Sequence, residues 1–246
     1  MNIASIILFY SSALIIGQGG VSTGVIQSPD ALLYNPAIIS RNIAASLTYA
    51  NPYGIQGLNY FNFGLSYRGI SIAGAQLALN ELYTEQTIFA GYRRKFKRRL
   101  DIGLGLGFHY IRIRGYNDVY SAVATGGIRY KIGPTYICGN FLKHTRERAN
   151  FTDEEANKFP DRYSLGFSLN LPQSVNWTVE WNPGEYVRGG VDIAFTNGFS
   201  VRMGIYDKSR FTLGFGLSTY NVGFDFAILE HRELGESLFF TLKAFK

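Results

Sequence analysis

Cysteine and charged residues are scarce in this chain of 246 residues. Cys138 is the single cysteine, which excludes an internal disulfide framework and a cysteine-based metal cluster. Charged residues make up only 17% of the chain, below the roughly 25% of ordinary soluble domains, whereas aromatic residues reach 15%. This composition argues against a disordered chain and against a typical cytosolic enzyme.

The net charge of +6 does not come from a dedicated basic arm. Lys and Arg are spread along the chain, apart from one cluster between Arg93 and Arg99. Nucleic acid is therefore not an expected partner, because nucleic-acid-binding domains gather their basic residues on one face or tail.

An apolar run of 14 residues, Ile3 to Ile16, is followed by Gly17. Its length is typical of the hydrophobic region of an export signal and is short for a bilayer-spanning helix, which needs roughly 20 residues. We therefore predict a signal peptide over residues 1–17 that directs the chain out of the cytoplasm. A buried strand or helix is the alternative for this run.

No second run of 18 or more apolar residues follows, so the remaining chain cannot cross a membrane as helices. A closed β-barrel is the one spanning structure left, because its backbone hydrogen bonds are all satisfied between strands.

From about residue 41 onward, apolar residues alternate with polar or small residues in segments of about ten. Between Phe211 and Thr219 the odd positions are Phe or Leu and the even positions are Thr, Gly or Ser. This period of two predicts strands with one apolar face. Together with the turn signals, the alternation predicts fourteen strands at 42–50, 58–68, 70–79, 84–94, 100–113, 119–132, 135–143, 162–171, 174–182, 186–196, 199–206, 210–219, 222–230 and 236–245.

The composition of the second face decides which side of the sheet meets solvent. A soluble β-protein turns its apolar face inward and shows water a surface rich in Lys, Glu and Asp. Here the second face consists mainly of Gly, Ser, Thr and Asn. We therefore expect an all-β transmembrane antiparallel barrel over residues 41–246, with apolar rows toward lipid and small polar rows toward the lumen.

The connection lengths fit such a barrel with both termini in the periplasm. The longest polar connections, about 144–161 and 230–236, follow the seventh and thirteenth predicted strands and fall at the same outer end. The connections predicted for the periplasmic end are all short.

Residues 18–40 do not alternate, and we expect them to form an N-terminal plug segment inside the barrel. Within them, Asp30 and Ala31 are followed by the tripeptide Asn35, Pro36 and Ala37. A glycine-rich lead with Asp-Ala and Asn-Pro-Ala just before the first strand resembles the amino-terminal signature of FadL-like and PorV/PorQ-type outer-membrane barrels. A simple linker that feeds the first strand is the alternative.

The resemblance implies a bacterial outer-membrane location and two classes of function. The PorV/PorQ type implies a barrel that binds partners in a type IX-like secretion system, either secretion-machinery or cell-surface proteins. The FadL-like type implies a passive channel for a hydrophobic or small amphipathic ligand, with the plug as its gate. We favour the first function at this stage and keep the second as the alternative; outer-membrane lipids are partners in both cases.

Charged residues at inward positions are expected to line the lumen, either as mutually satisfied polar filling or as a wall that orients a ligand. They are Arg68, Arg93, Arg129, Glu180, Arg188, Asp192, Arg202 and Asp225.

No catalytic, cofactor or metal site is expected. The glycines at 103, 105 and 107 fit one face of a strand better than a phosphate loop, because no helix pattern follows them. His109, His144 and His231 are isolated in the sequence and lack metal-ligand spacing. No nucleophile, base and oxyanion donor stand out as a set.

The basic cluster between Arg93 and Arg99 flanks the turn between the fourth and fifth predicted strands. In the proposed topology it faces the periplasm, where anionic lipid headgroups or an acidic partner would attract it; a solvated turn is the favoured explanation at this stage. Tyrosines near the strand ends, such as Tyr67, Tyr92 and Tyr130, are expected in the interfacial aromatic girdles.

Overall fold

A computed structural model gives the architecture of the chain. The structure describes residues 11–23, 27–145, 148–150, 156–158, 161–172, 174–184, 187–195, 198–207 and 210–246. Residues 1–10, which hold most of the predicted export signal, lie outside the described residues.

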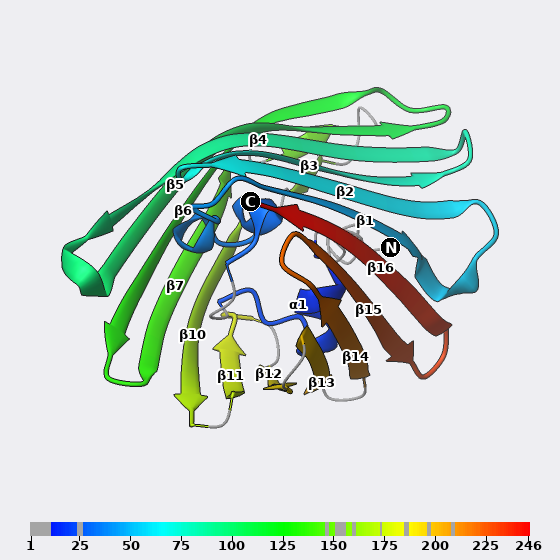
Figure 1. Ribbon diagram of the computed structural model, residues 1–246. Coiled ribbons are helices and arrows are strands. Elements are labelled where there is room, and N and C mark those ends of the chain that lie inside the picture. The colour runs from blue at the N-terminus through cyan, green and yellow to red at the C-terminus, as the bar shows by residue number, and fades with distance from the viewer. Residues whose placement is uncertain are drawn as a thin grey trace.

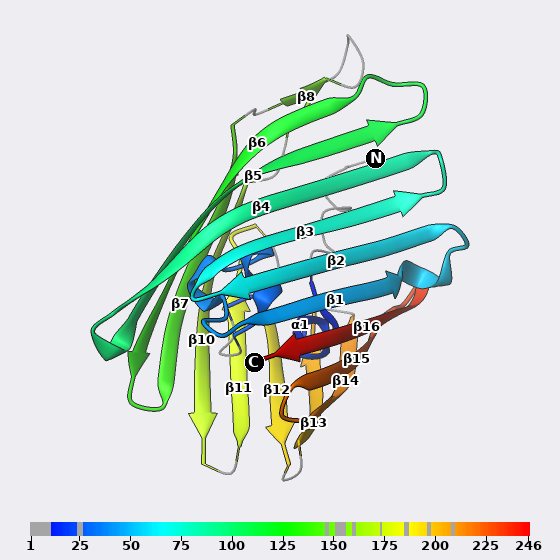
Figure 2. The same cartoon turned by 45° about the horizontal axis from the view of Figure 1, so that its top comes forward.

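Fourteen antiparallel strands form a closed barrel, in which each strand pairs with its neighbours along the chain and the first pairs with the last (Figures 1 and 2). The predicted fold class is confirmed. The barrel strands are β1 (Ala44–Asn51), β2 (Leu58–Tyr67), β3 (Ile70–Leu79), β4 (Tyr83–Phe96), β5 (Leu100–Ile113), β6 (Val119–Ile132), β7 (Thr135–His144), β10 (Arg162–Leu171), β11 (Val175–Trp181), β12 (Arg188–Ala194), β13 (Phe199–Ile205), β14 (Phe211–Ser218), β15 (Val222–His231) and β16 (Gly235–Phe245).

The other elements are short. They are α1 (Ala13–Gly17) and the 3-10 helices η2 (Pro29–Leu33), η3 (Pro36–Ile38), η4 (Pro52–Gly54) and η5 (Lys97–Arg99), with the two-stranded hairpin β8 (Arg148–Asn150) and β9 (Ala156–Lys158). Among the described residues, no helix combines the length and the apolar character that crossing a membrane requires.

Two connections differ from their sequence-based expectation. The segment at 144–161 contains the β8–β9 hairpin, whose strands of three residues are too short to show an alternating pattern. The segment at 230–236 is mostly strand, because β15 runs to His231 and β16 begins at Gly235.

The outer face of the barrel carries the apolar rows. Phe211, Leu213 and Leu217 are 58%, 58% and 52% exposed, whereas Thr212 between them is 1% exposed. A soluble β-protein would bury such rows against each other, so that alternative is wrong for this chain. A closed barrel with an apolar exterior matches the requirements of a lipid bilayer.

The antiparallel order divides the connections between two ends of the barrel. We call "turn end" the end that carries the β2–β3, β4–β5, β6–β7, β10–β11, β12–β13 and β14–β15 connections and the C-terminus. The opposite "loop end" carries the long β7–β10 connection with β8, at the top of Figure 2. By the general rule for such barrels, short turns lie in the periplasm and longer loops lie outside.

An arginine in place of Leu213 tests whether the outer face contacts lipid. We expect Leu213→Arg to lower the free energy of unfolding in phospholipid vesicles by about 2–4 kcal/mol, since a charge near the bilayer midplane is costly. Tyr220→Arg is the control, because Tyr220 lies in the β14–β15 connection and is 99% exposed. Equal urea midpoints for the two variants would contradict a lipid-facing position for Leu213.

Candidate functional site

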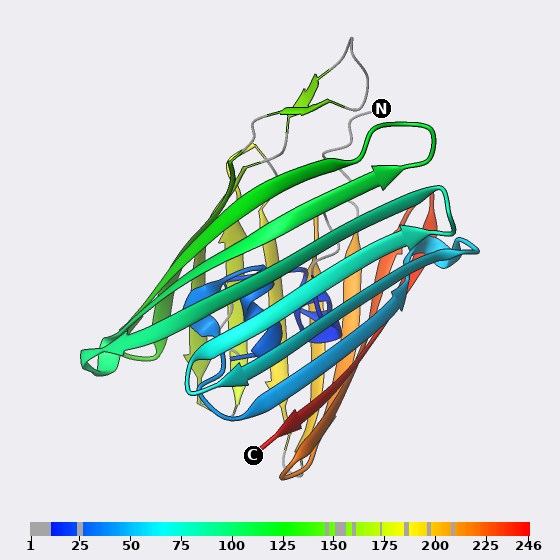
Figure 3. The same cartoon turned by 90° about the horizontal axis from the view of Figure 1, so that it is seen from above.

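The lumen of the barrel holds the N-terminal segment, drawn in blue inside the strands in Figures 1 and 3. We call residues 11–23 and 27–40 the plug. Its sequence cannot continue a strand ladder, because prolines begin η2 and η3 and glycines end α1. Residues 13–17, predicted as the end of the export signal, form α1 and are buried, and the export signal itself stays a prediction.

Glycines on the inner face of the wall provide the space in which the plug lies. A Cβ atom added to any of nine wall glycines would come within 3.0 Å of a plug atom. Without a side chain, a glycine lets another backbone approach closely. The nine glycines come from eight strands: Gly64, Gly91, Gly103, Gly105, Gly127, Gly166, Gly190, Gly204 and Gly214.

The Asn-Pro-Ala tripeptide lies over one pair of these glycines. Gly103 and Gly127 are cross-strand partners on β5 and β6. An added Cβ would lie 2.2 Å from the Pro36 carbonyl carbon at Gly103 and 2.1 Å from Asn35 Oδ1 at Gly127. The Asn35 side chain accepts a hydrogen bond from the Ala37 amide at 3.0 Å, which fixes the turn into η3.

Asp30 and Ala31, the other predicted plug residues, are fully buried in η2. The backbone of Asp30 lies over Gly64, and its carboxylate accepts hydrogen bonds from the Ser28 and Tyr34 hydroxyls. Burial raises the pKa of the Asp30 carboxyl, and the Ser28 hydrogen bond opposes this shift. Since the raised pKa makes protonation easier in the folded state, this carboxyl destabilises the folded plug as pH rises above the pKa of the unfolded chain.

Polar groups of the wall tie the plug near its middle and at its C-terminal end. Glu180 Oε2 accepts hydrogen bonds from the Ser22 amide at 2.7 Å, the Ser22 hydroxyl at 2.8 Å and the Thr23 amide at 2.8 Å. Arg93 donates to the Ile39 carbonyl at 2.6 Å. Each tie uses one charged partner, which makes the hydrogen bonds stronger than neutral ones.

Glu180→Gln tests the tie at Ser22 and Thr23. The substitution keeps an acceptor but removes its charge, and it is expected to weaken the tie by about 1 kcal/mol. We expect roughly fivefold faster hydrogen exchange at the Ser22 and Thr23 amides. Glu230→Gln, at an exposed position of β15, is the control and should leave both amides unchanged. Unchanged exchange in Glu180→Gln would show that other contacts hold this segment.

Apolar contacts also hold the plug against the wall. Ile16, Leu32 and Ile38 of the plug are fully buried and belong to one cluster with wall residues such as Tyr60 and Phe239. These two aromatic side chains point inward although the lumen was expected to be small and polar. The interior is therefore a packed core that joins the plug to the wall.

Five of the predicted inward charges lie in two separate ion-pair networks. In the first network, the Asp101 carboxylate forms ion pairs with Arg93 at 2.7 Å and with Arg129 at 2.9 Å. In the second, Arg202 lies 3.4 Å from Asp192 and 2.7 Å from Asp225, and Lys243 also pairs with Asp225.

One of the predicted inward residues, Arg68, lies outside the lumen, whereas Arg188 lines the interior. Arg68 is exposed in the β2–β3 turn, with its guanidinium 5.1 Å from the ring centre of Tyr67, because β2 ends one residue earlier. Arg188 is half-buried and stacks 4.5 Å from the ring centre of Tyr206. Asp101 and Lys243 were missed, although both occupy inward positions in the alternation of their strands.

Two histidines expected to be isolated meet in the lumen. His109 Nδ1 lies 3.2 Å from His144 Nε2, and His109 Nε2 lies 3.1 Å from Glu85. The Tyr83 hydroxyl donates to Glu85 at 2.7 Å. Within the described part of the chain, no group of three or more His, Cys, Asp or Glu residues is arranged to hold a metal ion.

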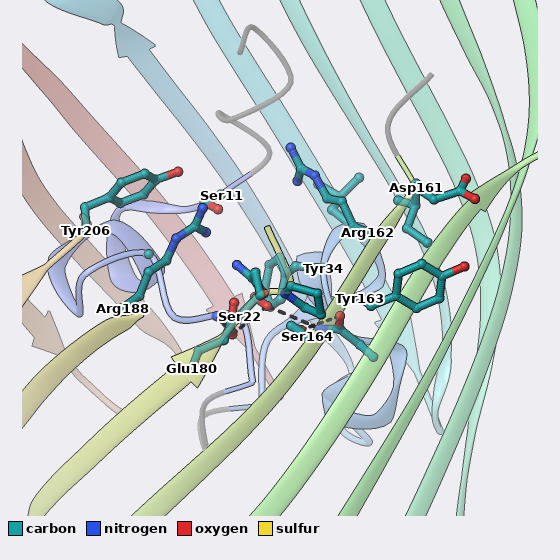
Figure 4. Close-up of a pocket in the computed structure, with 16 residues that line it drawn as sticks. Ser11, Ser22, Tyr34, Asp161, Arg162, Tyr163, Ser164, Glu180, Arg188 and Tyr206 are labelled. Carbon is teal, nitrogen blue, oxygen red and sulfur yellow. Dashed lines mark hydrogen bonds between the residues drawn. The ribbon is translucent and has the colours of Figure 1, made fainter. Parts of the chain in front are cut away.

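A cavity of about 70 Å³ lies between the plug and the wall. Figure 4 shows the side chains around it, which include Ser22 and Tyr34 of the plug and Glu180, Arg162 and Arg188 of the wall. Its volume is below the roughly 150 Å³ of a cavity that holds benzene, and its lining is polar. A small aromatic compound therefore does not fit in this cavity.

The fold and its seated segment define a plugged β-barrel of the outer-membrane type. No protein-family model matches the sequence, and no curated protein matches it. Solved structures do match the fold. The toluene transporter TodX of Pseudomonas putida superposes with a TM-score of 0.66 at 9% identity, covering 96% of each chain.

Two further structures agree. The monoaromatic hydrocarbon channel CymD gives a TM-score of 0.64 at 8% identity over 96% of this chain and 97% of its own. A FadL homologue of Pseudomonas aeruginosa gives 0.62 at 11% identity over 96% and 98%. The chain thus has the fold of FadL-like outer-membrane channels, which are transport proteins.

Proposed function

We propose that this chain is a passive outer-membrane channel for small hydrophobic or amphipathic compounds, gated by its own plug. The observation that carries the proposal is the seat of nine wall glycines and two charged ties that hold a separate segment across the lumen. A barrel with a purely structural role needs no such complementary surface. The transport described for TodX and CymD, which share the fold, supports this function over the secretion-associated one.

The strand pairing indicates the path that a compound would take through the barrel. The pairings on both sides of β3 run without a shift in register from Ile70 to Leu79, and every other barrel pairing is continuous over its described length. A lateral gap would interrupt at least one ladder. A compound would therefore cross along the lumen, and the plug has to move to let it pass.

The secretion-associated role that the PorV/PorQ resemblance implies remains a prediction. It requires a partner-binding surface at the loop end, and no observation on the described residues favours it over the channel.

A disulfide between the plug and the wall tests the gate. Leu32 lies over the glycine pair of β4 and β5, and a Cβ at Gly105 would be 2.6 Å from Leu32 Cδ1. We therefore suggest Leu32→Cys with Gly105→Cys in a Cys138→Ala background, reconstituted in liposomes. Toluene uptake is expected under reducing conditions and should fall to the level of protein-free liposomes after oxidation.

Leu32→Cys alone in the same background is the control, because it cannot form the bridge. Equal uptake by the oxidised and reduced double variant, with the disulfide verified by mass spectrometry, would refute gating by the plug. Uptake equal to protein-free liposomes in every state, including the unmodified chain, would refute the channel itself.

A further inference from the structure

The two ends of the barrel differ in the sign of their exposed charge. Basic side chains without exposed acidic neighbours lie at the turn end, on the side formed by β16 and by β1 to β6, and we call them the cationic rim. The rim consists of Arg41, Arg68, Arg94, Lys97, Arg98, Arg99, Lys131 and Lys246, all exposed.

No exposed acidic side chain accompanies the rim in the described part of the chain. Asp101 is the nearest carboxylate in the sequence, and it is buried between Arg93 and Arg129. The rim therefore keeps a strong positive charge that nothing in the described chain neutralises.

The loop end has both signs of charge. Its exposed carboxylates include Glu81, Asp118 and Glu233, and two of its arginines have carboxylate partners. Arg112 lies 4.0 Å from Asp118, and Arg114 lies 4.0 Å from Glu81. The net charge of +6 is thus concentrated on one side of the barrel rather than spread over it.

Aromatic side chains lie directly beside the rim. Tyr92 and Tyr130 are 52% and 41% exposed, and the Arg94 guanidinium lies 5.2 Å from the ring centre of Phe96. Aromatic rings at the ends of membrane strands sit at headgroup depth. The neighbouring cations are then held at the level of the lipid phosphates.

The three consecutive cations of η5 reach furthest toward such a surface. They join β4 and β5, which at 14 residues each are among the longest strands of the barrel. Figure 3 shows this turn extending beyond its neighbours at the left of the view. Residues of one charge at the tip of a rigid hairpin favour contact with an extended anionic layer.

From these observations we infer that the cationic rim binds the headgroups of anionic phospholipids in the leaflet at the turn end. A zwitterionic headgroup offers no net charge to the rim, whereas each Lys or Arg near an anionic surface changes the affinity by about fivefold. This inference is independent of what the barrel transports. It gives the chain a lipid preference and a fixed orientation of its turn end.

Native mass spectrometry of the folded barrel in non-ionic detergent tests the inference. We expect the unmodified chain to retain phosphatidylglycerol at least tenfold better than phosphatidylcholine, with the preference weakened by 0.5 M NaCl, which screens charge. The rim triple variant Lys97→Gln, Arg98→Gln and Arg99→Gln should lose most of this preference.

Arg112→Gln, Arg114→Gln and Arg232→Gln form a matched control at the loop end, since they remove the same number of exposed charges. Heat-dependent mobility on gels checks that each variant is folded. A phosphatidylglycerol preference that is lost equally in both triples, lost in neither or absent from the unmodified chain would overturn the inference. Preferential retention of lipid A by the rim would overturn the assignment to phospholipid.

Discussion

Alanine at both Gly103 and Gly127 is expected to expel η3 from its seat and to open the lumen. Each added Cβ would lie within about 2.2 Å of plug atoms, and at Gly103 those atoms belong to the Pro36 backbone, which cannot rotate away. Overpacking of this kind typically costs 1–3 kcal/mol per site, so we expect about 2–6 kcal/mol against the seated plug. The strand pairing needs no change, because alanine fits a ladder as well as glycine does.

The expected result is a barrel that keeps its heat-dependent mobility but conducts ions in planar bilayers at least tenfold more often than the unmodified chain. Gly139→Ala is the matched control, since Gly139 lies on β7 with the nearest atom 3.4 Å from an added Cβ. Conductance equal to that of the unmodified chain would show that the plug tolerates the two methyl groups. Loss of the folded band would instead make the plug part of the folding core.

These glycines show how far the sequence alone leads. Their alternation with leucines in β5 places them correctly on one inner face, because strand periodicity is a local property. Their role, which is to leave space for the plug, does not follow from the local sequence. It depends on Asn35 and Pro36 lying against residues almost 70 to 90 positions later in the chain, and no periodicity encodes such a distance.

The same limit applies to the amino end and to the histidines. An apolar run reads the same in an export signal and in a buried helix, so the sequence could not show that residues 13–17 pack inside the lumen. His109 and His144 are 35 positions apart and meet through β6, which lies between their strands. The successive pairing of β5, β6 and β7 supplies this contact.

The strand boundaries, by contrast, were largely predictable. Turns such as Gly133-Pro134 and the switch of alternation at Gly69 mark the ends of β6 and β2 within one or two residues. An outward apolar row must remain in register with the lipid along the whole strand, so the pattern extends over the full length of each strand.

Arg202→Met is expected to destabilise the barrel by about 3–5 kcal/mol, because it leaves the buried Asp192 carboxylate without its cation and leaves Asp225 with Lys243 alone. Arg202 is 5% exposed and joins Asp192 of β12 to Asp225 of β15 across β14. Gly216 on β14 makes this crossing possible, since a Cβ there would lie 2.8 Å from Arg202 Nη2. The network therefore links β13 to β15, which do not pair directly.

The urea midpoint of the folded barrel in detergent, read from the heat-dependent gel shift, measures this effect. Arg112→Met is the control, since an exposed ion pair contributes about 0–1 kcal/mol. Adding Asp192→Asn to Arg202→Met should restore part of the loss by removing one unpaired charge. A double variant no more stable than Arg202→Met, or a single variant no less stable than the control, would mean that water or Lys243 already satisfies both carboxylates.

The ion-pair network of Arg202 also affects the plug, because α1 packs against β13 and β14. An added Cβ at Gly17 would lie 3.4 Å from the Arg202 Cβ and 3.3 Å from the Gly214 Cα. Arg202→Met should therefore loosen the start of the plug as well as the wall, and hydrogen exchange at the Gly19 amide, which donates to Thr212, should accelerate with it. Exchange at the Ala37 amide, on the far side of the lumen, should stay slow, since η3 rests on β5 and β6 instead.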